Sequence, residues 1–296
     1  MSVKTQTKTF FEMIKVEHSV FALPFAYLGL VFARETRWQI WAGVTLVMVS
    51  FRTMGMAANR LIDRKIDAAN PRTAIRALPS GKLKSGFVWQ AALLSFLVFE
   101  ITTYQLNRLC FLLSPIPLLL AWLYPLAKRF TWLSHFVLGI ILGIAPYGAW
   151  LASGAGFSWA PGFLTLGVVA WVAGFDMIYA LQDREFDRSA GLYSFPARFG
   201  QPAALNAAAF LHALTLIAWT FAGRQAGSGI LFYAGILAAS VFLIREHWLV
   251  RSFSLKKIEE AFFTMNAWVG LTIFIASLMD RVVPVLINSD LLTRIR

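Results

Sequence analysis

Two pairs of aspartates, each spaced one helical turn apart, are the residues in this sequence that most suggest chemistry. Asp63 and Asp67 form the first pair, and Asp183 and Asp187 form the second at a matching place in the other half of the chain. On a helix each pair shares one face, where like charges repel unless a cation lies between them. Mg2+ usually binds one or two carboxylates together with phosphate oxygens. The spacing therefore predicts facing carboxylate pairs that hold Mg2+ against a diphosphate.

Each pair directly follows an apolar stretch of the sequence. This shared arrangement in the two halves of the chain is typical of an internal pseudo-repeat. Asn59 precedes Asp63 by one helical turn, and Asp176 lies on the same stripe as Asp183. Zn2+ is not expected, because no His or Cys accompanies either pair. The alternative is that the aspartates only form ion pairs with basic residues on solvent-exposed loops. The presence of two matching aspartate pairs favours the metal site over this alternative. The basic residues considered as such partners are Arg60, Arg64, Lys65, Arg184 and Arg188.

Other basic residues follow the acids along the chain. Arg72 and Arg76 come after the first pair, and Lys128 and Arg129 end a later apolar stretch that also carries Tyr124. Arginine binds phosphate through two parallel hydrogen bonds, and lysine acts as a point charge. Anchoring at a membrane surface would explain any one of these residues. Their clustering with the carboxylates favours a diphosphate as the ligand.

Two ionisable residues lie inside apolar stretches, where they are energetically costly and are therefore candidates for function. Arg52 lies two turns before Asn59 and could receive a substrate carboxylate. Asp176 lies one turn before Tyr179 and could act as a base or as an ion partner. Arg52 and Asp176 could also pair with each other. The histidines show no metal-ligand spacing and are expected to be hydrogen-bonded or interfacial: His18, His135, His212 and His247.

The composition indicates the elements that must position these residues. The chain is 58% hydrophobic and 14% charged, with a mean hydropathy of +0.64. A soluble domain has about 25% charged residues. We therefore expect one integral-membrane unit over residues 1–296, preceded by no removable signal, with a polar segment at 1–11. The net charge of +12 is explained by basic loops beside anionic lipid, so no nucleic-acid partner is expected. The single cysteine, Cys110, excludes a disulfide framework.

Nine apolar stretches are long enough to cross a bilayer, for which a helix needs about 17–25 residues. Most of the 27 lysines and arginines fall at the N-terminus and in the links after even-numbered stretches. By the positive-inside rule, this bias places the N-terminus and the polar links 59–85 and 182–202 in the cytoplasm. The predicted spans are 16–33, 38–58, 86–105, 109–127, 133–152, 162–181, 203–222, 229–245 and 261–279.

With these motifs the sequence resembles the UbiA superfamily of intramembrane aromatic prenyltransferases over nearly its whole length. Within the superfamily it is most similar to the 4-hydroxybenzoate polyprenyltransferases and to menaquinone-pathway relatives that act on dihydroxynaphthoate acids. The resemblance is carried by Asn59, Asp63, Asp67, residues 70–73, Arg76, residues 78–81, Tyr124, Pro125, Lys128, Arg129, Asp176, Tyr179, Ala180, Asp183, Arg184, Asp187, Gly191 and Ser194.

This resemblance implies nine transmembrane helices around a central cavity and Mg2+-dependent transfer of a polyprenyl group to an aromatic acid. Asp176 resembles an additional essential acid, Arg52 a contact to the acceptor carboxylate, and Tyr179 a substrate-binding residue. The residues that resemble Mg2+-diphosphate ligands are Asp63, Asp67, Asp183 and Asp187. Those that resemble diphosphate contacts are Asn59, Arg72, Tyr124, Lys128 and Ser194. The implied partners are a polyprenyl diphosphate, an aromatic acid and the lipid bilayer, in the inner membrane of a bacterium.

Two departures from the family pattern leave the acceptor open. Ile75 and Ala77 flank Arg76 where Asn and Pro often occur, and residues 17–25 differ from the usual opening of ubiquinone enzymes. Homogentisate, a chlorophyllide or a haem are alternative acceptors. A secondary transporter also has repeats and intramembrane acids, but those acids lie near the bilayer midplane. A membrane scaffold would not need paired carboxylates. In this sequence most of the acidic residues are predicted at helix ends on one side of the membrane, which favours an enzyme over a transporter or a scaffold.

Overall fold

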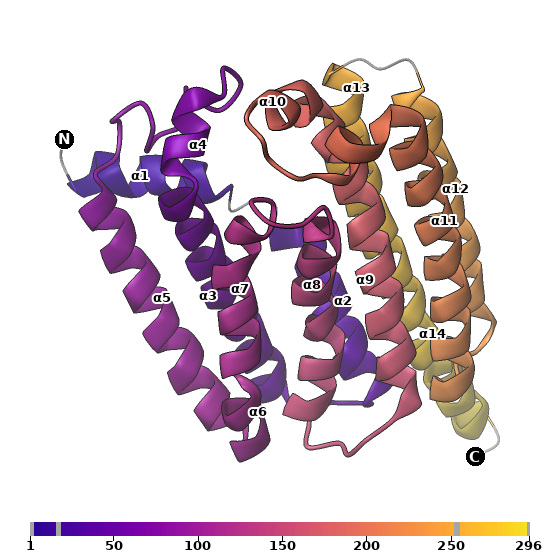
Figure 1. The fold of residues 1–296 in the computed structure, drawn as a ribbon. Coiled ribbons are helices and arrows are strands. Elements are labelled where there is room, and N and C mark those ends of the chain that lie inside the picture. The colour runs from indigo at the N-terminus through magenta and orange to yellow at the C-terminus, as the bar shows by residue number, and fades with distance from the viewer. Residues whose placement is uncertain (1–2, 16–18, 252–254, 295–296) are drawn as a thin grey trace.

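Long apolar helices run side by side through the molecule, and short helices and loops lie at its two ends (Figure 1). The computed structural model describes residues 3–15, 19–251 and 255–294. Within these ranges all regular structure is helical, which confirms the all-α prediction. The helices are α1 (Val3–Ile14), α2 (Ser19–Phe32), α3 (Trp38–Ile62), α4 (Arg64–Ala69), α5 (Ser85–Leu106), α6 (Arg108–Leu113), α7 (Pro115–Ala127), α8 (Ser134–Ala152), α9 (Trp159–Ala180), η2 (Leu181–Asp183), α10 (Arg184–Ser189), α11 (Phe195–Ala226), α12 (Ile230–Val250), α13 (Leu255–Glu260), the π-helix η3 (Ala261–Met265) and α14 (Asn266–Arg294).

The long helices match the predicted membrane spans. Eight helical segments of the described residues are long and apolar enough to cross a membrane, and they coincide with the second to ninth predicted spans. The first predicted span, 16–33, contains α2, in which Leu23–Phe32 is a shorter apolar stretch. Residues 16–18 of that span lie outside the described residues. The protein is thus a polytopic helical membrane protein, with eight described segments of spanning length where the sequence predicts nine.

Two predicted boundaries differ from the structure. The span predicted at 109–127 is divided into α6 and α7 at Ser114, because the following Pro115 has no N–H with which to continue the helix. Helix α11 begins at Phe195, inside the predicted link 182–202. Gly200 interrupts its first turns with a φ of +83°, a conformation that favours glycine. This kink explains why the start of α11 reads as a loop in the sequence.

The N-terminal segment predicted as polar contains a helix. From Val3 onward it forms α1, which lies across the same end of the bundle as α4 (Figure 1). Phe10, Met13 and Ile14 are buried in a cluster with residues of α3 and α5, whereas Lys8 is exposed. The helix is therefore amphipathic, as expected of a helix at a membrane interface. Its apolar residues lie mostly in its last turns, so the sequence pattern was too short to indicate it.

Helix α9 occupies the centre of the bundle and packs between α8 and α11. Its Trp171 is fully buried and lies against Phe25 of α2 and Trp219 of α11. Small residues allow these helices to approach closely, as is common between membrane helices. A Cβ atom added to Gly139 of α8 would lie 2.5 Å from the Val169 carbonyl oxygen. The central packing fixes the positions of the residues that α8 and α9 carry towards the cavity.

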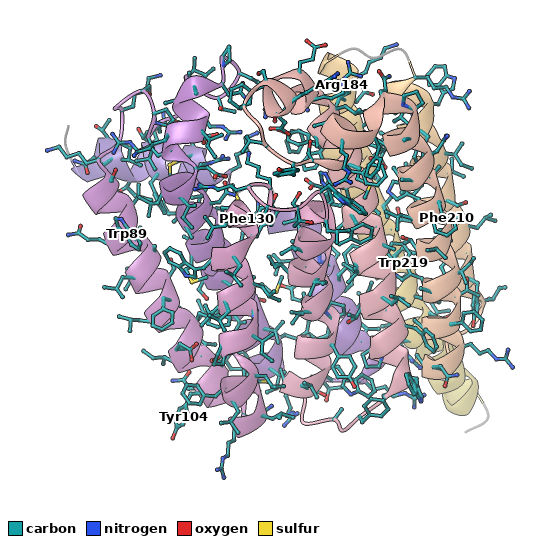
Figure 2. All side chains as sticks on the ribbon, in the orientation of Figure 1. Trp89, Tyr104, Phe130, Arg184, Phe210 and Trp219 are labelled. Atoms are coloured by element: carbon teal, nitrogen blue, oxygen red, sulfur yellow. The ribbon has the colours of Figure 1, made fainter. Side chains whose placement is uncertain are left out.

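The outer surface of the bundle is rich in apolar and aromatic side chains. Trp89, Tyr104 and Phe210 extend from its outer faces (Figure 2), and 50%, 69% and 64% of their surfaces are exposed. Monomeric soluble proteins rarely expose large contiguous apolar patches. A surface of this composition is suited to contact with lipid.

Both predicted acidic links lie at one end of the bundle. Helices α4 and α10, which carry the second aspartate of each pair, lie together at this end, and the link between α8 and α9 lies at the other end (Figure 1). Arg184 also lies at the end that carries α10 (Figure 2). Because each pair follows a long helix that ends here, residues far apart in sequence meet at this end.

Candidate active site

One cavity of about 740 Å³ is lined by most of the residues proposed from the sequence to do chemistry, although Arg129 is not among them. It extends from the end that carries α4 and α10 into the apolar interior, and α3, α7, α8 and α9 contribute much of its wall. The structure thus brings the two halves of the chain together around one space. The predicted site residues that line it are Arg52, Asn59, Asp63, Asp67, Arg72, Tyr124, Lys128, Asp176, Tyr179, Asp183, Asp187 and Ser194.

The first aspartate pair sits where α3 passes into α4. Asp63 ends α3, and its carbonyl oxygen accepts the backbone N–H of Asp67 at 2.7 Å. The helical spacing is therefore kept across the junction, and both carboxylates are buried. Arg76 pairs with Asp67 at 2.7 Å, and Arg129 pairs with Asp63 at 3.3 Å. Burial raises the pKa of Asp63, and the charges of the neighbouring basic residues oppose this rise.

The second pair is joined to the first polar link by Arg72. Its Nε donates to Asp183 Oδ1 at 2.9 Å, and a second guanidinium nitrogen donates to Asp183 Oδ2. Asn70 also donates to Asp183 Oδ1, at 2.9 Å. Burial disfavours the charged form of Arg72 and would lower its pKa. The hydrogen bonds and negative charge of Asp183 outweigh this effect of burial, so the pKa of Arg72 lies above its ordinary value. The two acidic motifs are therefore held together by a bidentate ion pair.

The ion pairs only partly follow the alternative considered from the sequence. Arg60, one of the predicted partners, lies 3.8 Å from Asp67, but Arg184 pairs with Glu185. The shorter pairs of Asp67, Asp63 and Asp183 are formed with Arg76, Arg129 and Arg72, for which the sequence pattern favoured phosphate as the ligand. Buried carboxylates need counter-charges, and only the tertiary fold brings these arginines close enough to supply them.

The carboxylates also fit a magnesium ion that is shared with a diphosphate. Their donor atoms are all oxygen, which suits a hard cation. Asp67 Oδ2 is buried without a hydrogen-bond partner in the described part of the chain. The described residues contain no group of three or more His, Cys, Asp or Glu side chains that could hold a metal ion by themselves. A Mg2+ ion held by one or two of these carboxylates would take further ligands from phosphate oxygens and water, as is usual for this ion.

The loop after α10 is tied to the end of α7. The backbone N–H of Tyr193 donates to the carbonyl oxygen of Lys128 at 2.6 Å. Ser194 caps α11, because its hydroxyl accepts the N–H of Ala197 at 3.4 Å. These contacts keep Lys128 and Ser194 near the buried Asp187, where the lysine charge and the serine hydroxyl act on its carboxylate.

Arg52 and Asp176 face the cavity from different helices. Arg52 of α3 donates to the carbonyl oxygen of Lys15 at 3.4 Å. Asp176 of α9 receives a hydrogen bond from His135, with 2.6 Å between Oδ2 and Nδ1. The hydrogen-bond partner of Asp176 is therefore a histidine of α8 and not Arg52, with which it could also have paired.

Sequence reasoning missed several residues that line this cavity. His135 was set aside because the histidines look scattered, although it follows Arg129 by only six residues and lies in the first turn of the next helix. Phe262 of η3 packs its ring 4.2 Å from that of Tyr179, and Lys15 places its ammonium group 4.7 Å from the ring centre of Phe263. The π-helix that carries these phenylalanines has no clear sequence signal.

Comparison of the sequence with known proteins identifies the family to which the chain belongs. The model of the UbiA prenyltransferase family matches residues 22–270, so the chain belongs to this family and is a prenyltransferase. The 4-hydroxybenzoate octaprenyltransferase of Francisella tularensis subsp. novicida is 31% identical over 237 residues, covering 80% of this chain and 82% of that protein. The 4-hydroxybenzoate octaprenyltransferase of Tolumonas auensis is 33% identical over 255 residues, covering 81% of this chain and 87% of that protein.

Solved structures show the same fold. A UbiA homologue from Aeropyrum pernix in its apo form superposes with a TM-score of 0.83 at 32% identity, covering 90% of this chain and 99% of that one. A UbiA homologue from Archaeoglobus fulgidus bound to GPP and Mg2+ has a TM-score of 0.70 at 20% identity, covering 91% of this chain and 99% of that one. The first confirms the fold predicted from the sequence, and the second supports the fold alone.

Proposed function

We propose that the protein transfers a polyprenyl group from an allylic diphosphate to a ring carbon of an aromatic acid, such as 4-hydroxybenzoate or a dihydroxynaphthoate acid. The observation that carries the proposal is the single cavity, which has both aspartate pairs at its polar end and an apolar interior. The reaction belongs to ubiquinone or menaquinone biosynthesis. The names of the Francisella and Tolumonas relatives support the choice of 4-hydroxybenzoate.

The polar end of the cavity is suited to a diphosphate. Asp63, Asp67, Asp183 and Asp187 would hold Mg2+, which when bound stabilises the diphosphate as a leaving group. Arginine and lysine side chains at this end contribute further positive charge. The residues proposed to contact the diphosphate oxygens are Asn59, Arg72, Tyr124, Lys128 and Ser194.

Arg52 is the proposed site for the acceptor carboxylate. It lies seven residues before Asn59 on α3, which corresponds to about 10 Å at 1.5 Å per residue. A guanidinium group binds a carboxylate through two parallel hydrogen bonds. An aromatic acid held there would present its ring to the allylic carbon of a diphosphate bound at the helix ends. Tyr179 and Asp176 line the cavity beside this path.

The apolar interior has two proposed roles. Side chains such as Val47, Leu138 and Leu142 line the cavity below the polar end and offer a surface for an isoprenoid chain. The same surface excludes water, which would otherwise capture the allyl cation that forms when the C–O bond breaks. Carbon attack beside the acceptor hydroxyl, followed by loss of a proton, then gives the prenylated aromatic acid.

We also propose that the polar end faces the cytoplasm of a bacterial cell and that the protein resides in the inner membrane. The distribution of lysine and arginine along the sequence supports this orientation. The relatives from Francisella and Tolumonas are bacterial proteins, which supports the compartment.

The test is product formation by membranes that contain the protein. They are incubated with a labelled prenyl diphosphate, Mg2+ and a panel of acceptors, and the products are identified by mass. A prenylated 4-hydroxybenzoate or dihydroxynaphthoate acid supports the proposal. A product from homogentisate, a chlorophyllide or a haem alone would replace the acceptor, and uptake of intact substrate without bond cleavage would indicate a transporter.

A further inference from the structure

One buried histidine connects three helices around the cavity. His135 lies in the first turn of α8, is only 3% exposed and lines the cavity. Its Nδ1 lies 2.6 Å from Asp176 Oδ2 in α9. Its Nε2 accepts the backbone N–H of Phe195, the first residue of α11, at 3.2 Å. Both ring nitrogens therefore have defined partners.

These two contacts determine where the imidazole carries its proton. A backbone N–H can only donate, so Nε2 of His135 must be the acceptor and must lack a proton. The proton of a neutral imidazole then lies on Nδ1, and this N–H donates a hydrogen bond to the carboxylate of Asp176. Because Nε2 is already used by Phe195, the histidine is not arranged to take a proton from a substrate.

The hydrogen bond restricts the orientation of Asp176. One carboxylate oxygen is bound to His135, while the side chain keeps 14% of its surface exposed and lines the cavity. We propose that His135 is a positioning residue that holds Asp176 in the orientation in which it receives the hydroxyl proton of the aromatic acceptor. The inference rests on the proposed function, because it assigns a role within that reaction.

The step balances as follows. The ring carbon beside the hydroxyl forms the new C–C bond to the allylic carbon, and the allylic C–O bond breaks with its electron pair on the diphosphate. The hydroxyl proton passes to Asp176, which leaves a neutral dienone. The ring becomes aromatic again when the substituted carbon loses its proton to the departed diphosphate and the oxygen takes a proton back from Asp176. Asp176 ends the cycle as a carboxylate that again accepts a hydrogen bond from the Nδ1–H of His135.

A purely structural role is the competing explanation, because His135 also anchors the start of α11. Trp132 packs its ring edge-on against Phe195 in the same place, with 5.6 Å between the ring centres. Two substitutions separate the roles. His135→Asn keeps an amide N–H near Nδ1 and so retains the donor to Asp176. His135→Gln keeps an amide oxygen near Nε2 and so retains the acceptor for Phe195.

The test compares kcat and the two KM values of these variants with those of the wild-type protein. His135→Gln should lower kcat about 100-fold, as a misplaced reacting group does, and should leave the KM for the prenyl diphosphate unchanged. His135→Asn should stay close to the wild-type kcat. His212→Gln is the matched control, because His212 is equally buried, bonds to His247 at 2.9 Å and does not line the cavity. It should lower the melting temperature without lowering kcat.

An Asp176→Asn background completes the test. In that background His135→Gln should cause no further loss of kcat, because the group it positions is gone. Equal loss of kcat in the Asn and Gln variants, or the full loss persisting in the Asp176→Asn background, would overturn the proposal.

A second readout does not depend on turnover. Nitrogen-15 NMR of His135 in the wild-type protein should show a protonated Nδ1 and an unprotonated Nε2, and the reverse tautomer would overturn the proposal. If the wild-type protein formed no prenylated product, the proposed function would fail, whereas the tautomer would still decide whether His135 donates to Asp176.

Discussion

The buried aspartates are held by arginines that lie far away in the sequence. Arg72 binds Asp183 through both carboxylate oxygens, and Arg129 reaches Asp63 from the end of α7. Each arginine is also well placed to meet an anion, because it lines the cavity or borders the residues that do. Guanidinium groups form strong bidentate bonds with both carboxylate and phosphate. The same side chains can therefore balance the charge of the aspartates and contribute positive charge to a diphosphate site.

The carboxylates should be essential for transfer. Asp63→Asn and Asp183→Asn each remove one negative charge from the proposed Mg2+-diphosphate site, so kcat should fall about 100-fold or more, the range found when a group that stabilises developing charge is lost. Transfer assays with and without EDTA measure the effect. Glu185→Gln is the matched control, since this acid of α10 is 90% exposed and should not be needed. Full activity in EDTA or in either aspartate variant would contradict the two-motif metal site.

Arg52 should determine the affinity for the acceptor. Arg52→Ala should raise the KM for the aromatic acid about 10- to 100-fold, equal to the ~1.5–3 kcal/mol of a hydrogen bond to a charged group. Arg52→Lys should rescue only partly, because a point charge lacks the fork geometry. The KM for the prenyl diphosphate is the internal control and should change little. The opposite pattern would assign Arg52 to the donor site.

At the scale of elements, the close contact between α8 and α9 sets the geometry of the site. His135 lies on α8 and Asp176 on α9, so their hydrogen bond requires these helices to keep their spacing. Gly139 and Gly143 of α8 make this spacing possible, because any Cβ there would meet Val169. Membrane helices associate through such packing, since water does not drive apolar faces together inside a bilayer.

Gly139→Ala should therefore destabilise the bundle. The new methyl group would lie 2.5 Å from the Val169 carbonyl oxygen, and overpacking of this kind costs about 1–3 kcal/mol. Thermal unfolding in detergent measures the change. Gly148→Ala on the same helix is the matched control, because nothing lies within 4 Å of its added Cβ and alanine favours helix more than glycine. An equal effect of the two substitutions would show that the close contact does not limit stability.

At the scale of the whole molecule, the two ends of the bundle should lie on opposite sides of the membrane. In a Cys110→Ala background, Gly156→Cys tests the exposed link between α8 and α9, and Lys82→Cys tests the exposed loop after α4. An impermeant thiol reagent added to intact cells should label the first and not the second, because the basic links are expected in the cytoplasm. The reverse pattern would invert the predicted topology.

Much of the site could be predicted because its main signals are local. The spacing of Asp63 and Asp67 places both on one helical face whatever the rest of the chain does. Length and hydropathy identified eight spans that coincide with helices of spanning length. The α6–α7 break and the early start of α11 were missed. Pro115, which has no N–H, and Gly200, which has a positive φ, act there through backbone geometry, which a hydropathy pattern does not register.

The sequence alone determined the class of protein, the positions of most of the long helices and many of the residues that line the cavity, because composition and helical periodicity act over a few turns. The tertiary structure decided which partners those residues have. Asp183 meets Arg72, Asp176 meets His135, and Lys15 reaches Phe263. Such contacts depend on how helices distant in the chain pack against each other, and no local spacing encodes that arrangement.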